Sequence, residues 1–270
     1  MRGVKGLDLF RKVSGDLSSQ TSIGGTITLI ALISMGTLFI TETIDYLSVS
    51  IRKETLVDQD RGSGKLPINF NITFPHAPCH LVSLDYMDSV GNHVLDVKEV
   101  VNKVRIDASG NVISEPFESS IESMTKALND GEGCRTEGTI KVVKVPGNFH
   151  ISFHAHHDKI HRLGSTAMSK VSFSHTIHHL SFGPGMLNQS IVRKFGQGSH
   201  TNFAPYDGLV ESAQRGVAIR HEYYISIVPI QYCNEVDHTE NYSYQFSMSS
   251  YNSQIRSLFG AVWFLSLIHI

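Results

Sequence analysis

Histidine is the residue type in this sequence with the most chemical potential. The chain has 15 histidines among 270 residues, and eight of them lie between His150 and His179. From Phe149 to His156, apolar residues alternate with His150, Ser152, His154 and His156. Such alternation predicts a strand, in which side chains two residues apart lie on one face about 7 Å from each other. We therefore predict that His150, His154 and His156 share one strand face.

Three uses of these histidines remain open. With an ordinary pKa near 6.5, they could sense protons: a fall in pH would add positive charge to this face, which would then bind an acidic protein surface more tightly. They could also ligate a metal, or simply form the polar surface of a sheet, and the same holds for His175, His178 and His179. A catalytic metal site usually adds a carboxylate, for which only Asp158 is near in sequence, so we expect no metal and no cofactor.

Other chemical motifs fail. The sequence has no Gly-x-Ser-x-Gly elbow, no phosphate-binding Gly-x-x-x-x-Gly-Lys loop and no Cys-x-x-Cys pair. Its formal net charge is −2, which argues against nucleic acid as a partner. We expect a binding protein rather than an enzyme.

One apolar stretch, Ile23–Ile40, is long enough to cross a membrane. It has 18 residues with no charge and no proline, which as a helix would measure about 27 Å. A cleaved signal peptide is the alternative, but the run is longer than a usual signal core and no small-x-small cleavage site follows. We predict a transmembrane helix over residues 23–43.

The charges beside this helix predict its orientation. The helix is preceded by the basic residues Arg2, Lys5, Arg11 and Lys12 and followed by the acidic residues Glu42 and Asp45. Basic flanks stay cytosolic, so residues 1–22 should form a cytosolic tail and residues 44–264 a lumenal domain. Three glycosylation sequons, at Asn71, Asn188 and Asn241, all lie beyond the helix and agree with this topology.

The lumenal region has the pattern of a β-protein. Leu66, Ile68, Phe70, Ile72 and Phe74 alternate with polar residues, which predicts a half-buried strand with Asn71 on its solvent face. Further strands are expected at 81–87, 94–106, 139–145, 149–155, 171–180, 218–232 and 242–248, with one helix at 118–128 and a long loop at 183–207. This pattern favours a mainly β fold, a sandwich of antiparallel sheets. Residues 258–270 are apolar but too short to span a membrane, and form either a last strand or the start of a segment that is cut off.

Several motifs resemble those of one known family, the ER–Golgi intermediate compartment proteins, which are COPII-vesicle cargo receptors. The matching stretches are Asp8–Val13 with the apolar helix, Ile68–Pro75 with Cys79, Leu84–Gly91, Gly133–Gly138, Val143–Phe149 and Ser174–Gly183. An N-terminal family region covers about residues 5–97 and a C-terminal one about residues 130–264. Family members carry a second membrane helix near the C-terminus; residues 265–270 do not match it, which suggests a truncation.

The resemblance implies a receptor or adaptor that cycles between ER and Golgi membranes. It would assemble with a related family subunit, bind lumenal or membrane cargo through its lumenal domain, and engage vesicle coat subunits through its cytosolic ends. Location in the ER, the intermediate compartment and the Golgi membrane follows from the same likeness.

The cysteines bear on an alternative function. Gly133–Gly138 and Val143–Phe149 look most like plant members named for disulfide isomerase, so thiol exchange in the ER is the runner-up; this chain lacks their thioredoxin insert. Of three cysteines, Cys79 and Cys134 lie in family-like motifs, and the ER lumen is oxidising. We therefore predict a Cys79–Cys134 disulfide with Cys233 free, the alternative being three buried free thiols.

Overall fold

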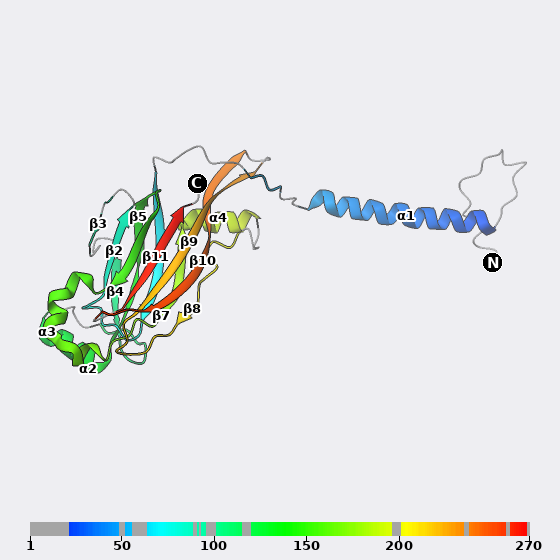
Figure 1. Cartoon of the computed structure of the whole chain (residues 1–270). Coiled ribbons are helices and arrows are strands. Elements are labelled where there is room, and N and C mark those ends of the chain that lie inside the picture. Colours follow the sequence, from blue (N-terminus) through cyan, green and yellow to red (C-terminus); the bar gives the residue numbers. More distant parts are fainter. Residues whose placement is uncertain are drawn as a thin grey trace, which may run out of the picture. The chain divides into compact units, whose positions relative to one another are not determined.

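The computed structural model describes residues 22–48, 52–55, 64–88, 91, 93–95, 101–114, 120–195, 201–234, 238–257 and 260–268. The chain divides into two compact units, residues 1–57 and 58–270, which are described in turn (Figure 1). The expected tail, apart from Ser22, lies outside the described residues.

The first unit contains one long helix, α1 (Ser22–Leu47), of 26 residues. Its large apolar side chains, Ile27, Ile30, Phe39 and Ile44 among them, are exposed. Its threonine hydroxyls bond back to carbonyls three or four residues earlier, as Thr37 does to Ile33, so few polar groups need an outside partner. Among the described residues, α1 is the one helix long and apolar enough to cross a membrane.

The second unit is a mainly β sandwich of two sheets. Sheet A has the strand order β4 (Val101–Ile106), β5 (Gly133–Val143), β1 (Lys65–Phe74), β7 (His175–Phe182) and β8 (Leu209–Glu211). Sheet B has the order β10 (Thr239–Gln254), β9 (Ile219–Asn234), β11 (Ala261–Ile268), β6 (Gly147–Ser152), β2 (Ser83–Asp88) and β3 (His93–Val94). Every pairing is antiparallel except that of β11 with β9. The expected antiparallel sandwich is confirmed, with this one parallel pair added.

The core lies between the two sheets and begins with β1. Its burial alternates along all ten residues, so Leu66, Ile68, Phe70, Ile72 and Phe74 face inward. The inner face of sheet B presents a matching set: Leu84, Phe149, Ile151, Tyr223, Ile225, Val262 and Phe264. The Phe70 ring meets Phe149 with centroids 6.4 Å apart, which joins the two faces. Burial of a large apolar side chain contributes about 1.5–3 kcal/mol, so the alternation of β1 is a principal stabilising element.

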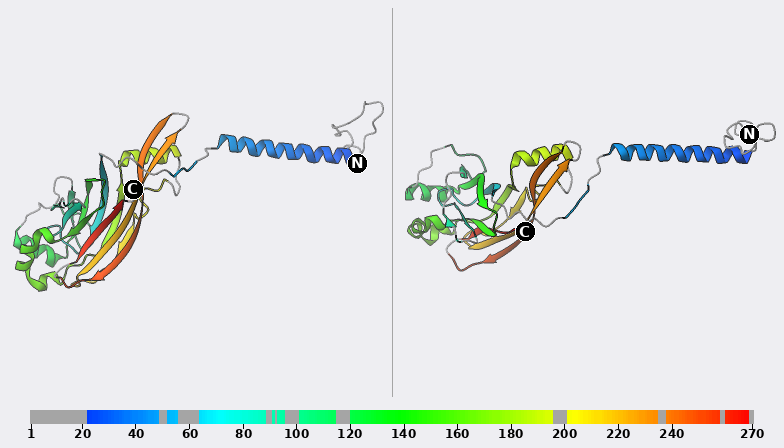
Figure 2. Two further views of the ribbon diagram at one scale, coloured as in Figure 1. Left: turned by 45° about the horizontal axis from the view of Figure 1, so that its top comes forward. Right: turned by 90° about the horizontal axis from the view of Figure 1, so that it is seen from above.

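The structure contains more helix than the sequence predicted. Besides α2 (Ile121–Asp130), it has α3 (His157–Met168), interrupted at Gly164, and α4 (Gly185–Phe195) inside the expected loop. The helices α2 and α3 lie side by side at one end of the sandwich (Figure 2). The apolar C-terminal stretch forms β11, so the strand alternative is the one observed.

Local capping explains where α2 starts and stops. The Ser120 hydroxyl accepts a hydrogen bond from the Ser123 amide at 3.1 Å, which satisfies one of the open donors at the helix start. Gly131 ends the helix in a left-handed conformation, with φ at 69°, and donates its amide to Ala127. The predicted helix at 118–128 is therefore present but shifted toward the C-terminus.

A disulfide connects the segment that follows β1 to β5. Cys79 and Cys134 are bonded, with their Cα atoms 4.7 Å apart, and both are fully buried, whereas Cys233 is an exposed free thiol. Beside the disulfide, the Arg105 guanidinium forms two hydrogen bonds, of 2.7 and 3.0 Å, with the Glu132 carboxylate. Bidentate ion pairs of this kind are stronger than single contacts. The disulfide and the Arg105–Glu132 pair therefore both stabilise this corner of sheet A.

A buried polar bridge joins the two sheets at His175, whose ring packs against Phe74 at the end of β1. The Nδ1–H of His175 donates to the Phe173 carbonyl at 2.9 Å, and the Tyr223 hydroxyl donates to its Nε2 at 2.6 Å. His175 belongs to sheet A and Tyr223 to sheet B, and His221 packs edge-on against His175. Burial lowers the pKa of His175 to about 4 because the charged imidazolium would lose its hydration. The ring is therefore neutral in the folded protein at cellular pH.

The disulfide should be needed for stability. It closes a loop of 55 residues, for which the chain-entropy model gives about 4 kcal/mol. We expect Cys79→Ala with Cys134→Ala to lower the unfolding free energy by about 2–4 kcal/mol, read from denaturant melts of the full chain in detergent. Cys233→Ala is the matched control and should leave the midpoint unchanged. Non-reducing mass mapping that placed Cys233 in the bridge would refute the pairing.

His175 should make the fold acid-sensitive. In the unfolded chain it protonates below about pH 6.5, whereas the folded ring resists protonation down to about pH 4. Between these two pH values the unfolded state binds more protons than the folded state. The free energy of unfolding should therefore decrease by up to about 1.4 kcal/mol for each unit by which the pH falls. Melts at a series of pH values should show this slope, and His175→Gln should reduce it.

The control for this pH series is His178→Gln, which changes an exposed histidine of the same strand. Its slope should match that of the unchanged chain. If the pH dependence of stability in His175→Gln equals that of the unchanged chain and of His178→Gln, other groups cause the acid sensitivity.

Candidate functional site

The histidine-rich segment does not form the predicted row. Strand β6 ends at Ser152, whose hydroxyl accepts the His154 amide at 3.2 Å, and His154–His156 form a short 3₁₀ helix, η2. The His156 amide donates to Phe153 within this turn. These bonds occupy donors that a longer strand would offer to its neighbours. The prediction that His150, His154 and His156 share one strand face is therefore wrong.

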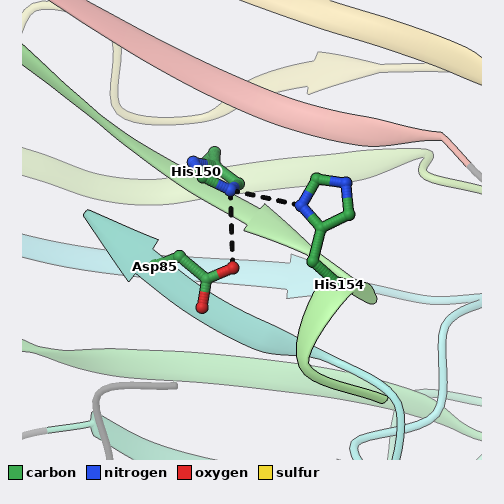
Figure 3. Close-up of side chains that lie close together, drawn as sticks. All are labelled: Asp85, His150 and His154. Carbon is green, nitrogen blue, oxygen red and sulfur yellow. Dashed lines mark hydrogen bonds and ion pairs between the residues drawn. The ribbon is translucent and has the colours of Figure 1, made fainter. Parts of the chain in front are cut away.

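The structure instead brings together Asp85, His150 and His154 (Figure 3). Asp85 on β2 lies directly opposite His150 on β6, and their Oδ2 and Nε2 atoms are 3.4 Å apart. The Nδ1 atom of His154 approaches the same Nε2 at 3.4 Å. Asp85 and His150 are buried, whereas His154 is exposed. The cluster thus has an inner pair and an outer member that can move.

The cluster belongs to a longer row on the outer face of sheet B. Strand register places Asp85, His150, Trp263, Glu222 and Tyr251 next to one another across five strands. The Trp263 ring stacks on His150 with centroids 4.0 Å apart and planes 13° from parallel. This indole covers one side of the imidazole and excludes water from it.

Asp85 could not be found from sequence spacing. It lies far along the chain from His150, and only the pairing of β2 with β6 makes them neighbours. Asp158, the carboxylate that sequence spacing indicated, lies in the first turn of α3 and is outside the cluster.

Electrostatics at the cluster keep His154 neutral to a lower pH than usual. Partial burial lowers its pKa most, and His150, His157 and His93 lower it further, while Asp85 acts in the opposite direction. Protonation of His154 therefore begins below the ordinary range. A pH-sensing role for His150, His154 and His156 stays a prediction, without the shared strand face on which it first depended.

The second histidine group is divided between the inside and the outside of sheet A. His175 lies in the core, whereas His178 and His179 point outward, because the pairing of β1 with β7 shifts between Asn71 and Ile72. The His179 ring bonds to Asp207 at 2.8 Å and to Ser181 at 2.9 Å. These three histidines serve packing and surface contacts at separate places.

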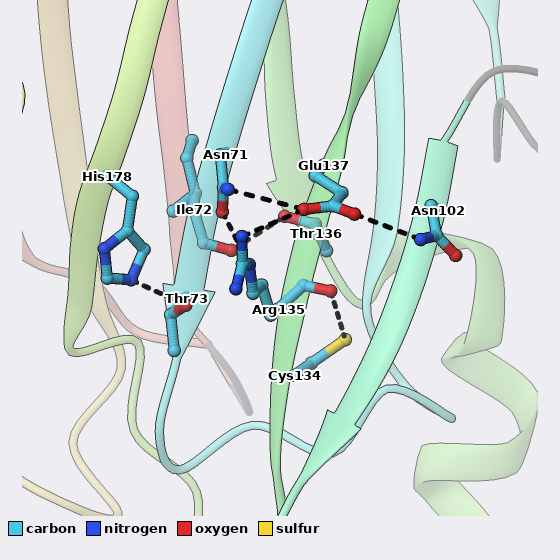
Figure 4. Close-up of polar contacts among 9 residues, drawn as sticks. All are labelled: Asn71, Ile72, Thr73, Asn102, Cys134, Arg135, Thr136, Glu137 and His178. Carbon is cyan, nitrogen blue, oxygen red and sulfur yellow. Dashed lines mark hydrogen bonds and ion pairs between the residues drawn. The ribbon is translucent and has the colours of Figure 1, made fainter. Parts of the chain in front are cut away.

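The outer face of sheet A carries a polar network around Asn71 (Figure 4). Arg135 donates to the Asn71 side-chain oxygen at 3.0 Å and pairs with Glu137 at 3.1 Å. Glu137 also accepts hydrogen bonds from the side-chain amides of Asn71 and Asn102, at 3.4 and 3.1 Å. Asn71 therefore lies on a polar outer face, half-buried within this network.

The other two sequons differ in exposure. Asn188 on α4 is only 7% exposed, and its side-chain oxygen accepts a hydrogen bond from the buried Ser243 hydroxyl. Asn241 on β10 is half-buried. A carbohydrate on Asn188 would require this contact to open, whereas one on Asn71 would extend from the outer face.

Family models match nearly the whole chain. Residues 4–95 match the Endoplasmic Reticulum-Golgi Intermediate Compartment family, and residues 92–261 match the Endoplasmic reticulum vesicle transporter family. The chain belongs to the endoplasmic reticulum vesicle transporter family. The motif-based resemblance is thereby confirmed.

Individual relatives agree with this family assignment. It is 29% identical to "Endoplasmic reticulum-Golgi intermediate compartment protein 1" of Danio rerio, over 97% of the chain and 78% of that protein. It is 30% identical to "Protein disulfide-isomerase 5-4" of Arabidopsis thaliana, but over only 48% of the chain and 26% of that protein. The crystal structure of Erv41p has the same fold, with a TM-score of 0.56 and 18% identity, covering 81% of this chain and 97% of that one.

The exposure of the three sequon asparagines predicts which of them carry a glycan. If the domain is lumenal, Asn71→Gln and Asn241→Gln should each remove one glycan, seen as a smaller mass shift on glycosidase treatment. Asn188→Gln should change nothing, because the folded position has no room for a sugar; this departs from the three sites expected from sequence. Asn69→Gln is the matched control on β1 and lies outside any sequon. Loss of a glycan in Asn188→Gln, or no glycan at any site, would contradict this account.

Proposed function

We propose that this protein is a membrane-anchored cargo receptor or adaptor in vesicle transport between ER and Golgi. The observation that carries the proposal is the family match over residues 92–261 together with the apolar helix α1 ahead of a β sandwich. In this proposal α1 crosses the membrane, residues 1–22 face the cytosol and residues 44–264 face the lumen. The basic residues before α1 and the sequons after it support that orientation.

The outer face of sheet B is the better surface for cargo. Along β9 and β10 it exposes Tyr224, Val228 and Tyr251, with 41–58% of each residue accessible. Tyrosine is enriched in protein interfaces because it offers a large apolar ring with a polar tip. The outer face of sheet A has a sequon on its central strand, and a glycan there would obstruct a partner. We call the surface formed by Tyr224, Val228 and Tyr251 the sheet B face.

The partners follow from the same proposal. A related family subunit would assemble with this chain in the membrane, cargo would contact the sheet B face, and vesicle coat subunits would bind on the cytosolic side. The location would be the membranes of the ER, the intermediate compartment and the Golgi. The relatives named for the intermediate compartment support this location.

Binding without catalysis is part of the proposal, and thiol exchange is the second candidate. Two of the three cysteines form a buried disulfide, and the exposed thiol of Cys233 has no partner cysteine with which to shuttle a disulfide. The isomerase relative matches only about half of this chain. Both observations favour the receptor.

Crosslinking in intact membranes tests the proposal. We expect secretory or membrane cargo and coat subunits to co-purify with the full chain. Tyr224→Ser with Tyr251→Ser should reduce cargo recovery at least about fivefold, since truncation of an interface aromatic typically costs 1 kcal/mol or more. Val210→Ser, which changes an exposed apolar residue on β8 of the other sheet, is the control. Mixed disulfides through Cys233 in place of cargo would favour thiol exchange, and recovery of neither class would reject both functions.

A further inference from the structure

We propose that Asp85, His150 and His154 form a binding site for a zinc ion. The ligand atoms are a carboxylate oxygen of Asp85, Nε2 of His150 and Nδ1 of His154, all of which lie within 4.8 Å of one another. The sequence alone predicted no metal because Asp158, and not Asp85, is the carboxylate near these histidines along the chain. The site lies on the same outer face of sheet B, at the other end of the cross-strand row from Tyr251, and its function goes beyond cargo binding.

The distances fit a tetrahedral ion. Ligand atoms bound to zinc at about 2.0–2.1 Å stand about 3.3–3.4 Å apart at the corners of a tetrahedron. Two of the three edges, from His150 Nε2 to Asp85 and from His150 Nε2 to His154, already measure 3.4 Å. The remaining edge is within 4.8 Å and can shorten by a rotation of the exposed His154 side chain. The two buried ligands are held in register by paired strands, which preorganises the site.

The proton distribution also suits a cation. The Nε2 atom of His150 faces both the Asp85 oxygen and the His154 nitrogen. This atom carries either one proton or one lone pair, so it can form a good hydrogen bond with only one of the two neighbours at a time. An ion at this point would instead accept a lone pair from all three atoms. Among the described residues, Nδ1 of His150 has no hydrogen-bond partner, so a proton can move there without breaking an existing bond.

The donor set selects the class of metal. Two imidazoles and one carboxylate suit zinc, whereas calcium and magnesium prefer oxygen ligands alone. Burial of Asp85 supports the same choice, because a buried carboxylate is stabilised by a nearby positive charge. Three protein ligands leave a fourth position for water. His157 and His93 are close enough to influence His154 electrostatically.

The stacked indole provides a direct readout. Trp263 is the only tryptophan in the chain, and it lies 4.0 Å from His150 between ring centroids. A change in the charge or ligation of His150 should therefore alter the whole tryptophan emission of the protein. The signal comes from this site alone, which separates it from binding by the other histidines.

The experiment uses the full chain in detergent, purified without a histidine tag and stripped with a chelator. Zinc is then titrated against a chromophoric chelator, with Trp263 emission recorded and metal content measured by mass spectrometry. We expect one zinc per chain and a fluorescence change that saturates at that ratio. Cobalt in place of zinc should give the intense visible absorption of a tetrahedral site.

Two variants and one control make the test specific. His154→Gln changes an exposed side chain and should weaken zinc binding at least about 100-fold, since even outer-shell changes cost about 10–100-fold. Asp85→Asn should do the same while keeping the shape of the side chain. His178→Gln, an exposed histidine of the other sheet, should bind zinc as the unchanged chain does. Substoichiometric zinc, no change in Trp263 emission, or equal affinity in His154→Gln and His178→Gln would overturn the proposal.

Discussion

The second unit, residues 58–270, depends on the burial of two facing apolar surfaces, and β1 supplies the central strip of one of them. Its inward residues contact sheet B, and its outward residues carry the polar network around Asn71. A shift of one residue would exchange these two sets, placing apolar side chains in water and amides in the core. The pairing of β1 with β5 over ten positions and the adjoining disulfide both oppose such a shift. The position of the polar network on the outer face of sheet A follows from this register.

Sequence patterns predicted what local periodicity determines. The alternation of β1, the β-rich class and the approximate position of α2 could all be read from neighbouring residues. The helix α4 could not, although Pro184 before it and Arg193 and Lys194 in its last turn are signals of a start and an end. Glycine, asparagine and serine in the same stretch favour a loop when they are considered alone. Packing of α4 against β10 decides in favour of the helix.

The histidine cluster shows where local reasoning fails. The alternation of apolar and polar residues around Phe149 continues only as far as Ser152. The Ser152 hydroxyl then accepts a hydrogen bond from the His154 amide, and the chain turns out of the strand. The same turn carries His154 back over sheet B, toward a strand pair formed by β2 and β6. The strand prediction was correct for the first residues of this segment. The carboxylate beside His150, however, belongs to Asp85 on β2, which is far away in sequence. No spacing rule contains that information.

The place of β11 in sheet B has a consequence for biosynthesis. This strand comes last in the described sequence, yet it lies between β9 and β6 and joins two otherwise separate halves of the sheet. Until residues 261–268 have been synthesised, β9 and β6 each expose an unpaired edge and the Phe149 ring lacks its stacked partner Phe264. The domain therefore matures only after nearly all of its residues are available, and chaperones that bind open strand edges have that whole interval in which to hold it.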